Sequence, residues 1–313
     1  MADVARIYPP GRVSLREVGL RDGLQMVAQW PTTRGKLEWL RREHAAGLRH
    51  FELGTFLPKQ RYPQFADIKE LVKEAARLVG AHGSALVPNL RGAEDALARG
   101  VEEIHCVISA SEAHNLANLN RTQEETLRGI GEIIALARQA ERPPVVGVGI
   151  AMSFGCSISG PVDPETVLGL AGLCYGMGAD IVALADTVGH AGPRQVEHLV
   201  RGIRRLAGDR PFGVHLHDTR GLGLANAAAA LHEGVRMLDA SLGGLGGCPA
   251  ARTATGNIVM EDLVFLCEKS GFDTGIDLEA LISVREVLER EMPGEPLHGA
   301  LARAGLPKAG GAP

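Results

Sequence analysis

Short apolar runs alternate with longer amphipathic segments along most of the chain. Apolar runs of roughly four to eight residues that end at Gly, Pro or a charged residue are typical of buried strands, whereas apolar residues that recur every three or four positions are typical of helices. The expected strands cover residues 13–20, 50–56, 83–88, 103–109, 144–153, 180–186, 212–217 and 235–242. The expected helices cover residues 33–46, 66–79, 92–99, 122–140, 163–176, 193–206, 223–232, 257–269 and 278–290.

This order of elements predicts the fold class. Strands that alternate with helices indicate a parallel sheet, and eight such units in one chain of 313 residues indicate an α/β fold, the (β/α)8 TIM barrel, with extra C-terminal helices. An open doubly wound sheet would need a glycine-rich phosphate loop after an early strand, but the first strand here runs into RDGLQ. We therefore expect a single catalytic domain over residues 1–313, with a flexible tail at 302–313 that is rich in Gly, Ala and Pro.

Composition narrows the partners and the compartment. The chain is 45% hydrophobic and 22% charged with a net charge of −4, so it has no basic surface for nucleic acid. It has no apolar run of the ~20 residues that a membrane helix needs, and the N-terminus has no apolar core of a secretory signal. Its five cysteines are scattered without a CxxC pair, which favours the reducing cytoplasm.

A pair of histidines gives the first chemical signal. His215 and His217 lie two residues apart at the end of an expected strand, so both imidazoles project from the same face. Two parallel imidazoles at a strand end are a good half of a divalent metal site. The alternative is two unrelated histidines that form hydrogen bonds at the rim of the barrel.

Other polar residues end several of the expected strands. Active sites of such barrels lie at the C-terminal ends of the strands, so these residues are expected to converge there. They are Arg21, Asp22, Gln25, Glu52, Thr55, Ser109, Ser111, Glu112, Asn118, Asn120, Ser153, Cys156, Asp186, Thr187, His215, His217, Asp218, Cys248 and Asn257. From these places at the strand ends we expect the substrate-binding residues to be Gln25, Ser109, Asn120 and Ser153.

The residue types predict a metal-assisted reaction. Asp22, His215, His217 and one amide oxygen would leave two octahedral positions, which suit a substrate hydroxyl and a neighbouring carbonyl or carboxylate. Arg21 would face a developing enolate oxygen as a fixed cation, although an arginine beside an aspartate also forms an ordinary salt bridge. Cys248 lies in the glycine-rich run GLGGCP, so we expect a closing loop whose thiol donates a proton; the alternative is a small buried side chain.

Five motifs resemble the hydroxymethylglutaryl-CoA lyase family of metal-dependent barrel lyases, which is related to isopropylmalate and homocitrate synthases. They are VGLRDGLQ (18–25), SASEAHNLANLN (109–120), LADTVG (184–189), HLHDTRGLGLAN (215–226) and GLGGCP…TGN (244–257). The similarity extends from about residue 13 to residue 278. The GCP loop separates this family from the synthases, which lack it.

The resemblance implies roles for individual residues. A Mg²⁺ or Mn²⁺ ion would be held by Asp22, His215, His217 and Asn257. The catalytic residues would be Arg21, Cys248, His215, Asp186 and Glu52. Arg21 would stabilise the enolate of acetyl-CoA, Cys248 would transfer a proton from the loop, and His215 would work in acid–base steps. Glu52 and Asp186 would support the substrate or move its proton.

The implied reaction is retro-Claisen cleavage of 3-hydroxy-3-methylglutaryl-CoA to acetyl-CoA and acetoacetate, as in leucine degradation. The resemblance also implies a dimer, which we expect in the cytoplasm. Three loops depart from the family pattern, at residues 57–64, 156–160 and 250–253. They leave open a related 3-hydroxyacyl-CoA, such as citramalyl-CoA or a longer branched homologue, as the substrate. A lyase or aldolase that acts on a hydroxy acid without CoA is a second alternative. A barrel that only binds acyl-CoA is a third, but the sequence argues against it, because all four candidate metal ligands, Arg21 and Cys248 are present.

Overall fold

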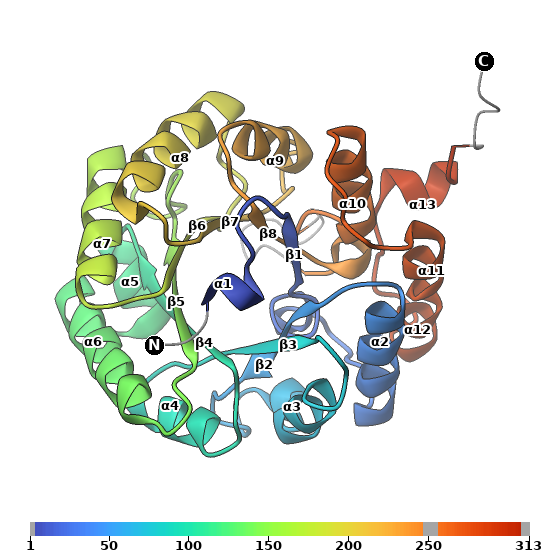
Figure 1. The fold of residues 1–313 in the computed structure, drawn as a ribbon, viewed down its shortest axis with the longest axis horizontal. Helices are drawn as coiled ribbons and strands as arrows, with labels where there is room; N and C mark the ends of the chain where they lie inside the picture. The colour runs from blue at the N-terminus through green and yellow to red at the C-terminus, as the bar shows by residue number, and fades with distance from the viewer. Residues whose placement is uncertain (1–3, 247–255, 308–313) are drawn as a thin grey trace.

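Eight parallel strands close into a barrel in sequence order, with β1 also paired to β8 (Figure 1). The computed structural model describes residues 4–246 and 256–307. The strands are β1 (Ser14–Glu17), β2 (His50–Thr55), β3 (His82–Leu86), β4 (Glu103–Ser109), β5 (Val145–Ala151), β6 (Ile181–Asp186), β7 (Phe212–Leu216) and β8 (Met237–Ala240). This confirms the expected (β/α)8 TIM barrel.

Helices surround the barrel, and the last helices of the chain form an additional group outside this ring (Figure 1). They are α1 (Val4–Ile7), α2 (Thr33–Ala45), α3 (Ile68–Ala75), α4 (Leu90–Leu97), α5 (Glu112–Leu119), α6 (Gln123–Gln139), α7 (Pro164–Gly176), α8 (Pro193–Ala207), α9 (Gly223–His232), α10 (Met260–Lys269), α11 (Leu278–Ser283), α12 (Arg285–Glu291) and α13 (Ala300–Ala304). Three single turns of 3-10 helix are η1 (Gly23–Gln25), η2 (Pro63–Phe65) and η3 (Leu242–Gly244). No helix within the described ranges is long and apolar enough to cross a membrane.

Several element boundaries differ from those expected. The first strand is four residues long instead of covering 13–20, because the carbonyl of Val18 accepts hydrogen bonds from the amides of Arg21, Asp22 and Gly23 and so begins a turn. The helix expected at 278–290 is divided into α11 and α12. The short helices α1, α5 and α13 were not expected. Residues 302–304 of the expected tail belong to α13, and 308–313 lie outside the described residues.

Inward-facing and outward-facing residues alternate along the strands. On β5, Val146, Val148 and Ile150 belong to the large apolar core between the barrel and the helices, whereas Gly147 and Gly149 face the barrel interior. Successive residues of a strand point to opposite sides, so the barrel wall separates two environments.

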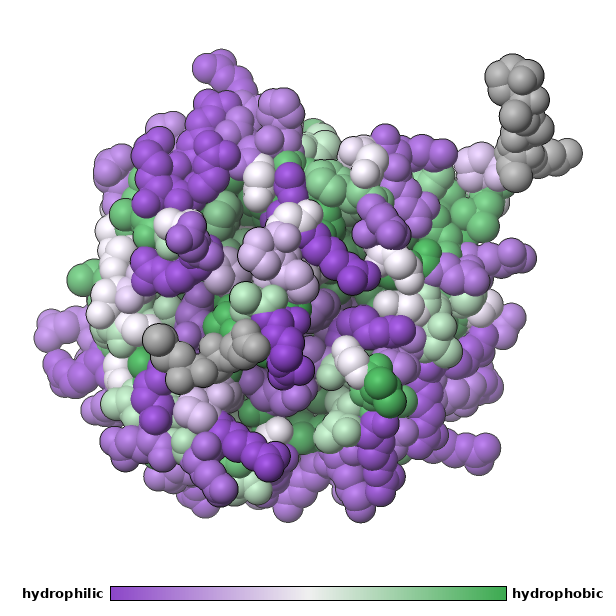
Figure 2. All heavy atoms as spheres, in the orientation of Figure 1, coloured by the Kyte–Doolittle hydropathy of each residue, from purple (hydrophilic) through white to green (hydrophobic). Residues whose placement is uncertain are grey.

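The N-terminal segment closes one mouth of the barrel. Tyr8 follows α1 and packs with Val145, Ile181 and Met237 at the first inward positions of three strands, and its hydroxyl donates a 2.7 Å hydrogen bond to Glu103. Figure 1 shows α1 in front of the barrel centre, and in Figure 2 hydrophilic residues cover much of the outer ring on this face. The loops after the strands, which carry the expected site, lie at the other mouth.

Candidate functional site

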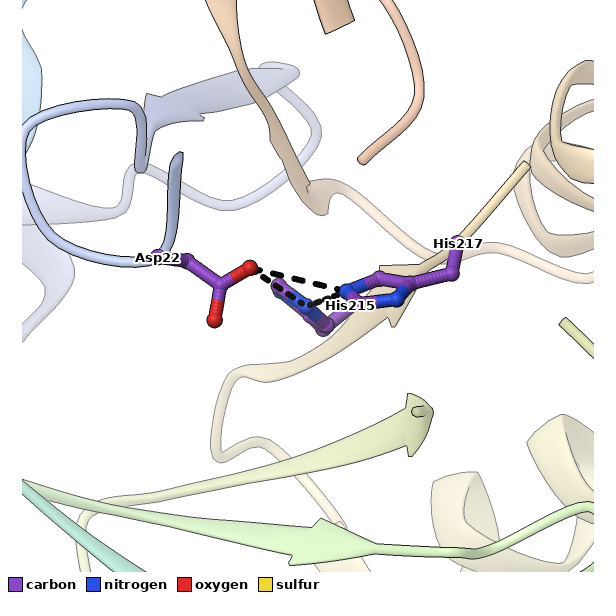
Figure 3. A group of neighbouring side chains, drawn as sticks. All are labelled: Asp22, His215 and His217. Atoms are coloured by element: carbon purple, nitrogen blue, oxygen red, sulfur yellow. Dashed lines mark hydrogen bonds and ion pairs between the residues drawn. The ribbon is translucent and has the colours of Figure 1, made fainter. Parts of the chain in front are cut away.

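Asp22, His215 and His217 meet at the C-terminal mouth of the barrel (Figure 3). His215 lies on β7, His217 follows the end of that strand, and Asp22 lies in the turn after β1. The two Nε2 atoms are 3.0 Å apart, and Asp22 Oδ2 lies 3.5 Å from Nε2 of His217 and 3.9 Å from Nε2 of His215. Two ring nitrogens and a carboxylate oxygen that face one point could hold a divalent metal ion.

The amide of Asn257 lies beside this group. Asn257 is fully buried, forms an isolated bridge with His217, and donates a 2.8 Å hydrogen bond from Nδ2 to Asp22 Oδ2. Its Oδ1 is buried with no hydrogen-bond partner among the described residues. A buried carbonyl oxygen without a partner is costly unless a ligand satisfies it, so the donor set of two imidazoles, one carboxylate and one amide oxygen fits a divalent cation.

Arg21 connects this group to Glu52. Its Nη1 donates a 2.7 Å hydrogen bond to Asp22 Oδ1, and its Nε lies 3.6 Å from Glu52 Oε1. Burial raises the pKa of Glu52 although the charges of Arg21 and His105 lower it. Burial also opposes ionisation of Asp22, but its contacts with His217, His215 and Arg21 outweigh this and hold its pKa far below the usual range. The site therefore presents a fixed cation between two carboxyl groups of different acidity.

A buried ion pair supports His215 from below. Asp239 on β8 lies 3.1 Å from Nδ1 of His215 and accepts two hydrogen bonds from Arg16 of β1, at 2.6 and 2.9 Å. Because Asp239 engages Nδ1, the other nitrogen of His215 points to Asp22 and His217. Sequence reasoning missed both Arg16 and Asp239. Their signal is a single charged residue within an apolar strand, which does not reveal its partner.

A cavity of about 330 Å³ opens beside the triad and extends into the barrel. Gln25, Glu52 and Arg21 border it at the mouth, together with Asn118 and His114 of α5. Of the four residues expected to bind substrate, Gln25 alone borders this cavity within the described residues. Asn118 takes the place expected for Asn120, which ends α5 in a left-handed conformation with φ of 53°.

Three other expected site residues are engaged in local structure. The hydroxyl of Ser153 donates to the carbonyl of Ile150 at 2.6 Å, and the hydroxyl of Ser109 accepts from the amide of Ser111 at 3.2 Å. The carboxylate of Asp186 accepts hydrogen bonds from the amides of His190 and Ala191, at 2.8 and 3.0 Å. Burial raises the pKa of Asp186 against these hydrogen bonds. Their roles toward a substrate remain predictions.

Cys248 and residues 250–253 lie outside the described residues. The described residues on either side of them lie near the metal-binding group: Asn257 contacts Asp22, and a Cβ placed on Gly246 would lie 2.9 Å from Nδ2 of Asn257.

The comparison with known proteins decides the family. A family model described as HMGL-like matches residues 12–288 of the chain. The chain belongs to the HMGL-like family. This confirms the resemblance found in the motifs and the expectation of a carbon–carbon lyase.

Named relatives of this HMGL-like chain cover nearly its whole length. Hydroxymethylglutaryl-CoA lyase YngG of Bacillus subtilis is 35% identical over 288 residues, which are 92% of this chain and 95% of the relative. (R)-citramalyl-CoA lyase of Chloroflexus aurantiacus is 40% identical over 304 residues, which are 94% of this chain and 95% of the relative. The solved structure of an HMG-CoA lyase from Acinetobacter baumannii with coenzyme A and 3-methylmalate is 35% identical, covers 100% of this chain and 99% of its own, and has a TM-score of 0.88.

Proposed function

We propose that the protein cleaves 3-hydroxy-3-methylglutaryl-CoA to acetyl-CoA and acetoacetate with the help of a divalent cation. The observation that carries the proposal is the group of Asp22, His215 and His217 beside Arg21 at the mouth of a closed-ended cavity. The relatives of Bacillus subtilis and Acinetobacter baumannii support this substrate because they are named for it.

The cation would be Mg²⁺ or Mn²⁺, held by Asp22, His215, His217 and Asn257. Carboxylate and amide oxygens suit these hard ions, and imidazole is tolerated. When bound, such an ion polarises a substrate oxygen and lowers the pKa of a hydroxyl group. Asn257 enters this ligand set through its Oδ1, which lacks a partner among the described residues.

The chain's own residues orient the substrate and balance its charge. Arg21 is partly buried and held beside Glu52 and Asp22, so its guanidinium is a preorganised cation for the thioester enolate oxygen. Asp239 fixes the ring of His215 through Nδ1. The raised pKa of Glu52 suits a carboxyl group that holds or accepts the proton of the tertiary hydroxyl. Cys248 is proposed as the group that returns a proton to the carbon of the enolate.

The test is a coupled assay for acetyl-CoA release from 3-hydroxy-3-methylglutaryl-CoA, with Mg²⁺, with Mn²⁺ and with chelator. We expect cleavage that depends on the metal. If cleavage continues in chelator, the proposed role of the cation is wrong. If folded, metal-loaded protein releases no acetyl-CoA, the proposed substrate is wrong.

Citramalyl-CoA is the second candidate substrate, because the relative named for it is 40% identical. The same assay run separately with each ester distinguishes the two, since the ratio of their kcat/KM values measures the preference directly. A lyase that acts on the free hydroxy acid would cleave that acid when no CoA ester is supplied.

We also propose that the thiol of Cys248 takes part in the reaction and that the protein forms a homodimer. Cys248→Ser should slow turnover strongly with metal content unchanged, and an unchanged rate would remove Cys248 from the mechanism.

Light scattering should give the mass of a homodimer, as the family resemblance implies, and a monomer mass would contradict this.

A further inference from the structure

The cavity beside the metal-binding group continues far below the metal ligands. Along β6, Ile181, Ala183 and Ala185 all border it. Ala185 pairs with His215 of β7, so Ala185 marks the level of the histidine. Ala185 lies four positions after Ile181, which is about 13 Å along a strand. Ile181 belongs to the cluster with Tyr8 at the opposite mouth, so the cavity extends through most of the barrel.

One wall of this cavity is lined by small or apolar side chains. Val107, Gly149 and Ala185 are each only partly buried although they lie within the strands of the barrel. The interior of a TIM barrel is ordinarily filled by branched side chains. Here that space is left open next to the metal-binding group.

Neither packing nor backbone conformation explains the glycine at position 149. A Cβ atom placed on Gly149 would lie 3.9 Å from the carbonyl oxygen of Cys106 and 4.0 Å from Val107 Cγ2, which is ordinary contact, and its φ is not in the left-handed region. At Gly147, by contrast, a Cβ would come within 3.1 Å of the ring of His105. Glycine within a strand weakens it and often marks a place that a ligand approaches closely. Gly149 therefore leaves room that the protein itself does not use.

The charged residues around this space limit which substrate groups can bind there. The floor is formed by His105 and Arg16, both of which contact the buried carboxylate of Glu103. Both side chains are already engaged by the carboxylate of Glu103, so the floor offers no free counter-charge for an ionised substituent. The remaining wall, from Val107 through Gly149 to Ala185, is apolar and suits a hydrocarbon chain.

We propose that the wall formed by Val107, Gly149, Ala183 and Ala185 binds an apolar C3 substituent longer than methyl, so that the preferred substrates are 3-hydroxy-3-alkylglutaryl-CoA esters with alkyl chains of several carbons. This inference rests on the proposed lyase function. The hydroxyl proton passes to a base, the C2–C3 electron pair moves into the thioester enolate, and C2 takes up a proton. The products are acetyl-CoA and a 3-oxo acid that carries the alkyl chain, and no oxidant is needed.

The test compares kcat/KM for the methyl, butyl and hexyl esters. Wild-type protein should cleave the butyl ester at least as efficiently as the methyl ester. In Gly149→Leu the ratio of butyl to methyl should fall by at least about 100-fold, and Gly149→Ala, which adds one methyl group, should lower it by a smaller factor. Gly172→Leu on α7, where a Cβ has open space around it, is the matched control and should leave the ratio unchanged. A wild-type kcat/KM for the butyl ester below that for the methyl ester, or a ratio unaffected by both Gly149 variants, would overturn the inference.

A binding measurement separates this inference from the proposed function. If the methyl ester is cleaved and the longer esters are not, the lyase stands and the inference falls. If no ester is cleaved, calorimetric titration with free 3-hydroxy-3-alkylglutarates decides whether the cavity binds alkyl chains. We expect affinity to rise about fourfold per buried methylene in wild type and to stay flat in Gly149→Leu. A flat series in both proteins would show that the wall binds no alkyl chain.

Discussion

Two opposite walls of the barrel interior differ sharply in chemistry. In the closed order of strands, β1 and β2 lie across from β5 and β6. The charged wall is formed by Arg16, Glu52 and Asp239 on β1, β2 and β8. The open wall is formed by Val107, Gly149, Ala183 and Ala185 on β4, β5 and β6. The charged wall is connected by ion pairs to the metal-binding group, whereas the open wall contributes space.

The contrast suggests a division of labour within one fold. A buried charge needs a partner fixed in place, so side chains on the charged wall depend on one another over many strands. A small side chain makes no such demand and changes the shape of the cavity independently of the chemistry. Substitutions on the charged wall should therefore affect metal binding and stability, whereas substitutions on the open wall should affect the choice of substrate.

The largest effect is expected at the metal-binding group that the charged wall supports. His217→Ala removes one of three ligand atoms that face the same point, so metal retention and turnover should both be lost. The rate should fall by about 10³-fold or more, which corresponds to about 4 kcal/mol. Metal content after dialysis and the rate of acetyl-CoA release measure this, and circular dichroism checks the fold. Full activity with no retained metal would contradict the assignment.

A large loss of stability is expected from Arg16→Leu. Arg16 is 4% exposed and contacts two buried carboxylates, Asp239 and Glu103. Removing the cation leaves Asp239 without its main counter-charge and Glu103 without one of its partners, so we expect destabilisation of about 3–5 kcal/mol. On the open wall, Ala183→Gly should cost less than about 1 kcal/mol. Urea denaturation of the two variants tests the contrast, and equal losses would contradict it.

The charged network continues to the opposite mouth of the barrel, where pH should control stability. Burial lowers the pKa of His82, but its interactions with Glu102 and Glu103 outweigh this and raise the pKa to about 9, above the ordinary histidine value of 6.5. The protonated form is thus favoured by folding. Its contribution, on the order of 3 kcal/mol, is fully present below pH 6.5 and is lost as the pH rises through 9.

The measurement is the free energy of unfolding at pH 6, 7.5 and 9.5 for wild type and His82→Gln. The difference between the two proteins should shrink as the pH rises, because glutamine keeps a hydrogen-bond donor but does not titrate. A difference that is constant with pH would show that His82 does not carry this charge.

The sequence predicted one of these walls better than the other. Strand and helix order followed from periodicity, and the His-x-His spacing placed both imidazoles on one face. The pairing of Arg16 with Asp239 was hidden, because 223 positions separate the two residues and only barrel closure brings β1 beside β8. The open wall was hidden for another reason. Gly149 lies in the apolar run VVGVGIA, which has the pattern of a buried strand, and its unfilled space depends on neighbours from other strands.

The smallest expected effect has the opposite sign and lies on the open wall. Gly149→Ala places a methyl group at ordinary contact distance from Cys106 and Val107, and φ at this position is not left-handed. Since alanine restricts the unfolded chain more than glycine does, the variant should be more stable by about 0.4–1 kcal/mol. Urea denaturation measures the gain, with Gly172→Ala in α7 as a control in helical surroundings. Destabilisation by Gly149→Ala would mean that the space is needed for packing in the free protein, whereas a gain in stability means that the protein gives up stability there to keep the cavity open.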